Sequence, residues 1–375
     1  MKEGWSIKPF GDCIEKVKVT TKLQSSLYKD SGIYPIVSQE KELISGYWDN
    51  KEDLFCHSTP LVVFGDHTMV VKYIDFDFVV GADGVKILMP KPFLLPKFFY
   101  YWVSSVQIQS RGYARHFRYL KETSVPIPSL SEQQRIVDIL DAEFAKIDAL
   151  KGNAEKQLQQ TKALLRQQQN VTFTKQQSVP LQSMVEIING YAFKSEDFDK
   201  SHTVKAIKIT NVGVGTFVET DDTNLACCHL HDQKDFIAHS GDIVIALTRT
   251  IISDGLKVAI VPNSYNQALL NQRVALLRIN DDILREYLYY YFQTTEVKKY
   301  VLGRVNELMQ PNLSIKDLRA MPIPCCEREE MHKCVTNLKY FDELCNTLKS
   351  NYMKTIHLCN DLKQALLRKA FNGEL

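Results

Sequence analysis

The chain has 375 residues, of which 45% are hydrophobic and 24% are charged, a balance typical of a globular protein with two or three domains. Its 46 basic and 44 acidic residues give a net charge of +2, so composition alone does not indicate a polyanionic partner. No segment approaches the roughly 20 apolar residues of a membrane span, and the N-terminal segment lacks the apolar core of a signal peptide. Nine cysteines without a Cys-x-x-Cys pair favour reduced thiols and a cytoplasmic location.

The first part of the chain predicts a mixed α/β domain. Short β-branched runs between turn signals predict strands near 33–37, 61–64, 69–73 and 85–88. An aromatic-rich segment near 96–105 then predicts a helix.

A long helix is predicted after the first domain. Ser131 to Gln134 reads as a capping box, in which the Ser131 hydroxyl accepts a hydrogen bond from the backbone N–H of Gln134. A helix of about 40 residues extends roughly 60 Å at 1.5 Å per residue. Apolar or small residues recur every three or four positions along it and form one stripe, at Ile136, Leu140, Phe144, Ile147, Leu150, Ala154, Leu158, Thr161 and Leu165.

The second part repeats this order of elements. Strands are predicted near 204–210, 242–247, 257–261 and 273–279, and an aromatic-rich helix near 282–294. A second long helix follows without a Ser or Thr cap, so its first turn is expected to be looser. Its stripe contains Val335, Leu338, Phe341, Cys345, Leu348, Tyr352, Ile356, Cys359, Leu362 and Leu366.

Matching segments indicate an internal duplication. Leu-Leu-Pro-Lys-Phe-Phe-Tyr-Tyr-Trp-Val at 94–103 resembles Ile-Leu-Arg-Glu-Tyr-Leu-Tyr-Tyr-Tyr-Phe at 283–292. Val-Pro-Ile-Pro at 125–128 recurs as Met-Pro-Ile-Pro at 321–324, and each long helix contains one Ala-Leu-Leu-Arg. Such matches in the same order predict one structural unit present twice. Only the later elements of the two domains align; the first halves differ in sequence.

The duplication predicts an α+β fold in which two mixed domains are held apart by two long antiparallel helices with pseudo-two-fold symmetry. The alternative is that each helix packs only on its own domain. The predicted domains are a first mixed domain, a central long helix, a second mixed domain and a C-terminal long helix, at 1–130, 131–176, 177–324 and 325–375. The predicted helix-pairing seam consists of Ile136, Leu140, Phe144, Ile147, Leu338, Phe341, Leu348 and Ile356.

Common catalytic motifs are missing from the sequence. It contains no G-x-x-x-x-G-K-[ST] phosphate loop, no H-E-x-x-H and no G-x-S-x-G. Gly213-Val214-Gly215 is interpreted as a turn rather than a dinucleotide site. Cys227 to His231 could be imagined as metal ligands, but adjacent cysteines cannot easily point at one ion and no second ligand pair completes a site. We therefore expect no catalytic residue, metal or cofactor on this chain.

Two segments have the chemistry of nucleic-acid binding. Residues 110–119 combine arginines with aromatic rings, which suit phosphate oxygens, guanine edges and stacking. In the second half, residues 303–312 are rich in Asn and Gln, which can bond to adenine edges. A solvated loop without a partner is the alternative for each. The candidate DNA-binding residues are Arg111, Tyr113, Arg115, Arg118, Arg249, Arg304, Asn306, Gln310 and Asn312.

The sequence resembles the specificity subunit of type I DNA restriction-modification systems over essentially its full length. The resemblance rests on Val-Pro-Ile-Pro-Ser-Leu-Ser-Glu-Gln-Gln-Arg-Ile-Val at 125–137 and Leu-Lys-Gln-Ala-Leu-Leu-Arg-Lys-Ala-Phe-Asn-Gly-Glu-Leu at 362–375. Asn-Gly-Tyr-Ala-Phe-Lys-Ser at 189–195 and Gly-Asp-Ile-Val at 241–244 also match its second recognition domain. The second helix departs from the pattern at 327–330, which affects how symmetrically partners are expected to dock.

The resemblance implies a non-catalytic subunit with two target recognition domains. Each domain would read one half of a split double-stranded DNA sequence, and the helices would set the spacer between the halves. The family also implies two methyltransferase partner subunits and, through them, restriction-translocation subunits; S-adenosylmethionine, ATP and Mg²⁺ are expected only on those partners. A protein scaffold without base reading and an enzyme fragment are the rival interpretations. We expect the isolated chain to bind DNA weakly and with steep salt dependence.

Overall fold

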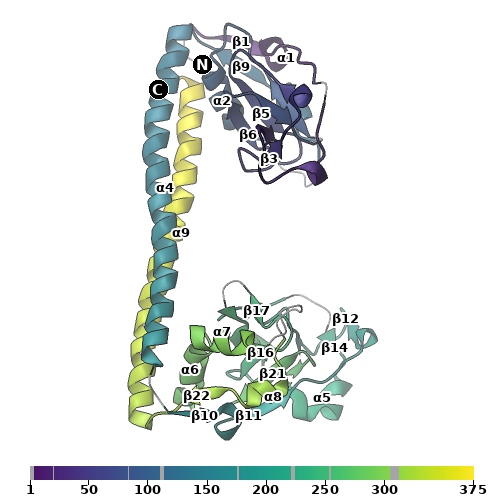
Figure 1. Cartoon of the computed structure of the whole chain (residues 1–375), viewed down its shortest axis with the longest axis vertical. Coiled ribbons are helices and arrows are strands. Elements are labelled where there is room, and N and C mark those ends of the chain that lie inside the picture. Colours follow the sequence, from purple (N-terminus) through teal and green to yellow (C-terminus); the bar gives the residue numbers. More distant parts are fainter. Residues whose placement is uncertain are drawn as a thin grey trace. The chain divides into compact units, whose positions relative to one another are not determined.

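The structure is a computed structural model that describes residues 4–19, 21–82, 84–109, 114–174, 177–220, 224–252, 255–304 and 312–375 (Figure 1). The chain divides into two compact units. The first comprises residues 1–155 and 353–375, and the second comprises residues 156–352. Each unit therefore contains one mixed domain and parts of both long helices. The candidate Arg111, Tyr113, Asn306 and Gln310 lie outside the described residues.

The mixed domain of the first unit contains two small sheets, with strand orders β6-β5-β8 and β3-β2-β7-β4. A separate antiparallel pair joins β1 to β9 and so brings the two ends of the domain together. The helices are α1 (Phe10–Cys13), α2 (Pro96–Ser105) and α3 (Phe117–Lys121). The strands are β1 (Ser6–Pro9), β2 (Tyr34–Val37), β3 (Gly46–Trp48), β4 (Leu54–Phe55), β5 (Leu61–Gly65), β6 (Val71–Ile74), β7 (Phe78–Val80), β8 (Val85–Leu88) and β9 (Ser124–Ile127).

The second domain has sheets of order β11-β21-β16-β19 and β13-β20-β15, the end pair β10-β22, and the small pairs β12-β14 and β17-β18. Its helices are α5 (Cys228–Asp232), α6 (Asp282–Tyr291), α7 (Thr295–Leu302) and α8 (Ile315–Arg319). The strands are β10 (Ser178–Pro180), β11 (Glu186–Asn189), β12 (Phe198–Asp199), β13 (Ala206–Ile207), β14 (Asn224–Leu225), β15 (Ile237–Ala238), β16 (Ile243–Ala246), β17 (Ile251–Ile252), β18 (Gly255–Leu256), β19 (Val258–Ile260), β20 (Ala268–Leu270), β21 (Val274–Arg278) and β22 (Pro322–Pro324).

The two domains share one topology. The antiparallel trio β6-β5-β8 corresponds to β19-β16-β21. The parallel pair β2-β7, extended by antiparallel β4, corresponds to parallel β13-β20 extended by β15. The duplication therefore includes the first halves, which the sequence comparison could not align. The predicted fold class, with two repeated mixed domains and two long helices, is confirmed.

The strand predicted near 204–210 is much shorter than expected. It stops at Ile207 because the backbone N–H of Lys208 donates to Asn211 Oδ1 at 2.8 Å, and the Asn211 N–H donates back to the Lys208 carbonyl at 3.0 Å. Similarly, the helix predicted near 282–294 ends at Tyr291, because Thr294 caps the next helix through the Val297 N–H. Polar side chains that bond to nearby backbone thus end both elements.

The two long helices are α4 (Leu130–Thr172) and α9 (Arg328–Asn372). The predicted capping box of α4 is wrong by two residues: the Ser129 hydroxyl accepts from the Glu132 N–H at 3.3 Å, and Ser131 lies inside the helix. Ser129 satisfies one of the backbone donors that a helix start leaves unpaired.

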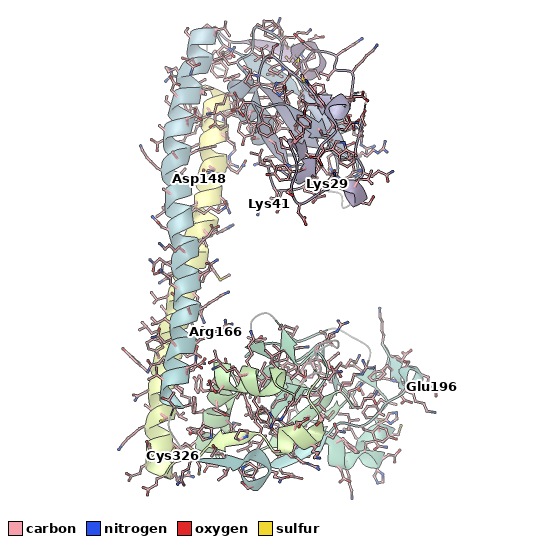
Figure 2. The ribbon with its side chains drawn as sticks, viewed as in Figure 1. Lys29, Lys41, Asp148, Arg166, Glu196 and Cys326 are labelled. Carbon is pink, nitrogen blue, oxygen red and sulfur yellow. The ribbon has the colours of Figure 1, made fainter. Side chains whose placement is uncertain are left out.

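Cross-helix contacts show that α4 and α9 are antiparallel. In the first unit, Lys363 Nζ lies 2.5 Å from Asp148 Oδ1, and Lys151 Nζ donates to Asn360 Oδ1 at 2.9 Å. The residue number rises along one helix as it falls along the other, as antiparallel packing requires. Figure 1 shows the two ribbons side by side, and Figure 2 labels Asp148 on α4.

The predicted stripes pack on the domains as well as on the other helix. In the first unit Ile136 and Leu140 belong to one buried cluster with Phe98 of α2 and Leu367 of α9. In the second unit Leu338 lies in the core cluster that contains Tyr287 of α6. The long helices therefore pack on each other and on the domains, and the alternative that each packs only on its own domain is wrong. Leu150 and Leu362, assigned to the stripes, are exposed by 54% and 50% and lie outside the packed seam.

A buried glutamine joins the first domain to α4. Gln133 is 0% exposed, and its Nε2 donates to the carbonyls of Phe93 and Pro128 at 2.9 and 3.0 Å. Its Oε1 accepts the Leu95 N–H at 2.8 Å, directly before α2. One side chain therefore fixes the start of the aromatic helix to the start of the long helix.

In the second copy, an ion pair forms the equivalent junction between the domain and the long helix. Arg328, the first residue of α9, pairs with Asp281, which caps α6 by accepting the N–H groups of Ile283 and Leu284. The departure from the first copy at 327–330 is thus compensated within the junction itself.

Candidate nucleic-acid interface

The first arginine-rich segment lies around α3. Arg115 and Arg118 are exposed, and the Arg118 guanidinium donates to the Tyr119 hydroxyl at 2.5 Å and lies 4.6 Å from the ring centroid. His116, between the two arginines, is fully buried. The segment therefore presents cations outward while a buried residue anchors it.

A buried aspartate positions this segment. Asp66, 3% exposed at the end of β5, accepts the Phe117 N–H through Oδ1 at 2.9 Å, and its carbonyl accepts the His116 N–H at 2.8 Å. Lys86 Nζ lies 3.4 Å from Asp66 Oδ2 and partly balances its charge. Sequence reasoning did not single out Asp66 and missed this role. The signal available was an acidic residue at the end of an apolar strand.

The second domain builds the equivalent arrangement with different residues. Arg249, just after β16, is exposed and has φ 48°, a left-handed conformation that is unfavourable for a side chain with a Cβ. Its backbone N–H donates to Asn312 Oδ1 at 3.2 Å. Thr250 Oγ1 accepts the Leu313 N–H at 3.2 Å. The structure thus brings Arg249 and Asn312 together, although 63 positions separate them.

Arg304 is held against the protein surface. Its guanidinium lies 3.5 Å from the centroid of Tyr300, donates to the Tyr300 carbonyl at 3.3 Å, and lies 3.4 Å from Asp317 Oδ1. Arg304 therefore sits at the end of α7 in a partly compensated environment, unlike Arg115.

The same three-part arrangement occurs in both domains. The turn after the central strand, β5 or β16, binds the segment that precedes a short helix, α3 or α8. All five described candidates, namely Arg115, Arg118, Arg249, Arg304 and Asn312, lie in or beside these parts.

Sequence reasoning also missed a hollow in the second domain. The hollow has a volume of about 480 Å³ and is lined by aromatic, amide and basic side chains, among them Phe193, Phe198, Lys208, Gln272 and Arg273. Lys208 Nζ lies 4.5 Å from the Phe198 ring centroid. Gly190 is required here because a Cβ would lie 2.0 Å from the Asn271 carbonyl oxygen.

Of the predicted seam residues, Ile136, Leu140, Ile147 and Leu338 are buried. Phe144, Phe341, Leu348 and Ile356 are half-buried. Phe144 packs edge-on against Tyr101 of α2, with ring centroids 5.4 Å apart. The seam thus contributes to domain docking as well as to helix pairing.

Within the described ranges, no group of three or more His, Cys, Asp or Glu side chains is arranged to hold a metal ion. Cys227 and Cys228 are exposed at the start of the short helix α5. None of the helices in the described part of the chain is both long and apolar enough to cross a membrane.

The family model for the type I restriction modification DNA specificity domain matches residues 2–160 and 174–357. The chain belongs to this family. The two matched stretches agree with the duplicated architecture, because each contains one mixed domain and part of a long helix.

Individual relatives support the same assignment. The chain is 24% identical over 374 residues to the type I restriction enzyme MjaVIII specificity subunit of Methanocaldococcus jannaschii, covering 91% of this chain and 87% of that protein. A solved chain from a study of complex assembly and conformational transition of the type I R-M system has a TM-score of 0.70 at 16% identity, covering 100% and 99% of the two chains. The HsdS subunit from Thermoanaerobacter tengcongensis has a TM-score of 0.50 at 18% identity, covering 100% and 98%.

Proposed function

We propose that this specificity subunit reads a bipartite double-stranded DNA site, one half with each mixed domain. The proposal is carried by the arrangement present in both domains, a strand-end turn that holds a polar or arginine-rich segment. The first copy offers mainly arginine, which suits guanine and phosphate, and the second offers Asn312 beside Arg249, which suits adenine and phosphate. Two copies with different side chains would read different half-sites.

The subunit would act without catalysis of its own. The exposed candidates are cationic and amide side chains, which are suited to binding DNA rather than to catalysing a reaction. They lie on loops positioned by rigid strands. S-adenosylmethionine, ATP and Mg²⁺ would then be bound by the partner subunits. A cytoplasmic site of action fits the nine free cysteines.

Two methyltransferase subunits, and restriction-translocation subunits through them, are the proposed protein partners. Apolar side chains left exposed on α4 and α9 support this, because such residues on a helix favour a protein partner. The first unit exposes Leu150, Leu358 and Leu362, and the second exposes Leu164, Tyr340 and Leu344. One set in each unit fits two copies of the same partner.

The test is the methylome of cells that express this chain together with its methyltransferase partner, compared with cells that express the partner alone. Methylation of one split motif that depends on this chain is expected. An Arg115→Ala, Arg118→Ala variant should lose or relax one half of the motif and keep the other, since each domain reads separately. An Arg135→Ala variant, on α4 away from the interface, should leave the motif unchanged. Absence of new methylation despite a stable complex would refute DNA reading.

A further inference from the structure

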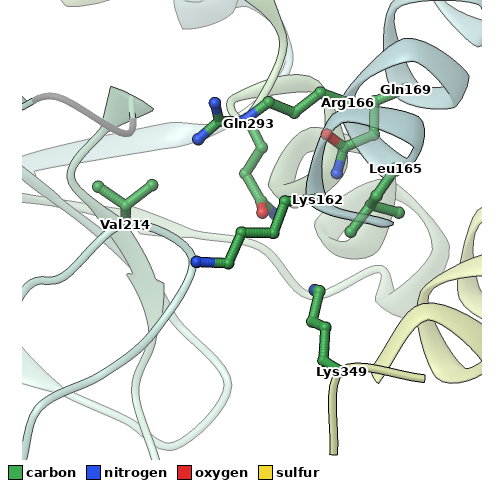
Figure 3. Close-up of a pocket in the computed structure, with 7 residues that line it drawn as sticks. All are labelled: Lys162, Leu165, Arg166, Gln169, Val214, Gln293 and Lys349. Atoms are coloured by element: carbon green, nitrogen blue, oxygen red, sulfur yellow. The ribbon is translucent and has the colours of Figure 1, made fainter. Parts of the chain in front are cut away.

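A basic pocket lies in the second unit, between its helix segments and its mixed domain (Figure 3). Its volume is about 230 Å³. The lining residues come from α4, α9, the turn at 213–215 and the segment after α6: Lys162, Leu165, Arg166, Gln169, Lys349, Val214 and Gln293. Of the polar residues among them, sequence reasoning noted only Arg166, as part of the repeated Ala-Leu-Leu-Arg.

The pocket concentrates positive charge. Three of its lining residues are cationic and none is acidic. Lys162 and Arg166 are one helical turn apart on α4, where like charges repel. Lys349 donates to the neutral Asn346 Oδ1 at 3.1 Å, and its acidic neighbour Asp342 lies outside the pocket lining. Placing three cations around one hollow favours a negatively charged occupant.

A buried amide also points to a ligand. Gln169 is only 2% exposed and lines the pocket. Figure 3 shows its amide directed into the pocket beside Arg166 and Lys162. The amide N–H groups of such a side chain can donate to an occupant with acceptor oxygens.

The opposite wall of the pocket is rigid. Gly215 has φ 66°, its carbonyl accepts the Tyr289 hydroxyl at 2.6 Å, and a Cβ at this position would lie 2.8 Å from Gln293 Oε1. The Gly215 N–H donates to the Val258 carbonyl at 3.0 Å, and the neighbouring Lys257 N–H donates to the Thr250 carbonyl at 2.8 Å. The wall is therefore connected through backbone hydrogen bonds to the turn that carries Arg249.

We propose that this pocket binds the DNA sugar-phosphate backbone next to the half-site read by the second domain. The inference rests on the proposed DNA-reading function. A phosphodiester offers a full negative charge with several acceptor oxygens, which matches cations together with amides, and the backbone is continuous with bases that lie near Arg249. The contact would be independent of base sequence and would position the second domain on the duplex.

The test measures binding of the full-length chain to a fluorescent duplex by anisotropy, over a series of salt concentrations. The pocket variant is Lys162→Gln, Arg166→Gln, Lys349→Gln. The matched control is Lys156→Gln, Lys333→Gln, Lys354→Gln, which removes three exposed charges from the same two helices outside the pocket. The affinity of the pocket variant should fall about tenfold or more, and its salt slope should decrease by about 0.9 for each phosphate that it no longer binds. The affinity of the control should fall far less.

A second variant separates binding from folding. Gln169→Glu places a negative charge among the three cations, so the thermal melting temperature should rise or stay constant while DNA affinity falls. A fall in both would indicate a structural role and overturn the proposal.

Other outcomes are equally decisive. An equal fall in affinity in the pocket and control variants would show that overall charge causes the effect. This result would refute the phosphate-binding role of the pocket but not the proposed DNA reading. Undisturbed DNA binding with loss of the co-purified methyltransferase subunit would assign the pocket to an acidic protein segment. Stabilisation by inorganic phosphate, with the DNA affinity of the pocket variant unchanged, would assign it to a free anion. Absence of DNA binding by the wild-type chain at low salt would refute the proposed function itself.

Discussion

Lys97 Nζ of α2 lies 2.8 Å from Asp141 Oδ2 of α4, and the equivalent pair in the second copy has the opposite polarity. Glu286 occupies on α6 the position that Lys97 occupies on α2, and its Oε1 lies 2.6 Å from Lys339 Nζ of α9. Each domain is therefore matched in charge to the helix on which it docks. Docking on the other helix would bring like charges together, which is unfavourable.

Reversing one charge should weaken the docking of the second domain. Glu286→Lys should lower the free energy of unfolding of the second domain by about 1 kcal/mol. The cost is modest because the Glu286–Lys339 pair is half-exposed, and it arises because the new contact is repulsive. Adding Lys339→Glu should restore most of this stability. Urea denaturation of both single variants and the double variant checks this. Additive destabilisation in the double variant would show that the two residues do not interact.

Gln133 should be much more important for stability than its neighbour. Gln133→Ala leaves the Leu95 N–H and the carbonyls of Phe93 and Pro128 without their buried partner, which should cost about 3 kcal/mol. Gln134→Ala, at an exposed position whose side chain donates to the exposed Asp138, is the control and should cost less than about 0.5 kcal/mol. Denaturation midpoints of the two variants give the comparison. Similar midpoints would show that the buried hydrogen bonds of Gln133 do not stabilise the junction.

Asp342 should make stability depend on pH. Burial raises the pKa of this α9 carboxyl, and the nearby Glu343 adds to the shift, while Lys349 and a hydrogen bond from Asn346 oppose it. A raised folded-state pKa means that the native state holds the proton more tightly than the unfolded state, so this group favours folding at low pH and disfavours it as pH rises through its folded pKa.

Asp342→Asn should therefore raise the denaturation midpoint at pH 7.5, and the difference from wild type should narrow towards pH 4. Glu155→Gln removes an exposed charge that does not contribute to the shift of Asp342 and provides the control. A constant difference between Asp342→Asn and wild type across this range would show that the carboxyl does not titrate abnormally.

Arg249 should lower the stability of the protein while strengthening its binding to DNA. Because it has φ 48°, Arg249→Gly should leave stability unchanged or raise it by up to about 1 kcal/mol, while DNA affinity falls by about fivefold through removal of the cation. Gln267→Gly relieves a similar φ of 65° at an exposed position and should keep wild-type affinity. Melting curves and anisotropy on the same samples test both effects. Weaker binding by Gln267→Gly would point to a general change in the domain.

The sequence predicted the elements whose stabilising pattern is local. The strand at Val85–Leu88 and the helix at Pro96–Ser105 occur as expected, because β-branched runs and a proline at a helix start act within a few residues. The parallel pair of Ala206–Ile207 with β20 could not be predicted, since its two residues carry no periodicity and their partners lie 63 positions away. Long-range pairing rather than local preference determines such strands.

The sequence predicted the types of residue at the candidate interface better than the contacts between them. Exposed arginines at 115 and 118 follow from composition, whereas the contact between Arg249 and Asn312 depends on how a strand end meets a distant segment. The predicted capping box gave roles to Ser131 and Gln134 and none to Gln133, whose partners are Phe93, Leu95 and Pro128. The basic pocket was invisible because its cations are spread over two helices.

The two junctions between aromatic and long helices should respond differently to the solvent. The first depends on the neutral, buried amide of Gln133, which neither counterions nor protons can disturb within the usual range. The second depends on Arg328, whose hydrogen bond lowers the pKa of Asp281, so concentrated electrolyte or strong acid would loosen it first. The duplicated junction therefore depends on a neutral amide in one copy and on an ion pair in the other, and only the second should weaken as the salt concentration rises.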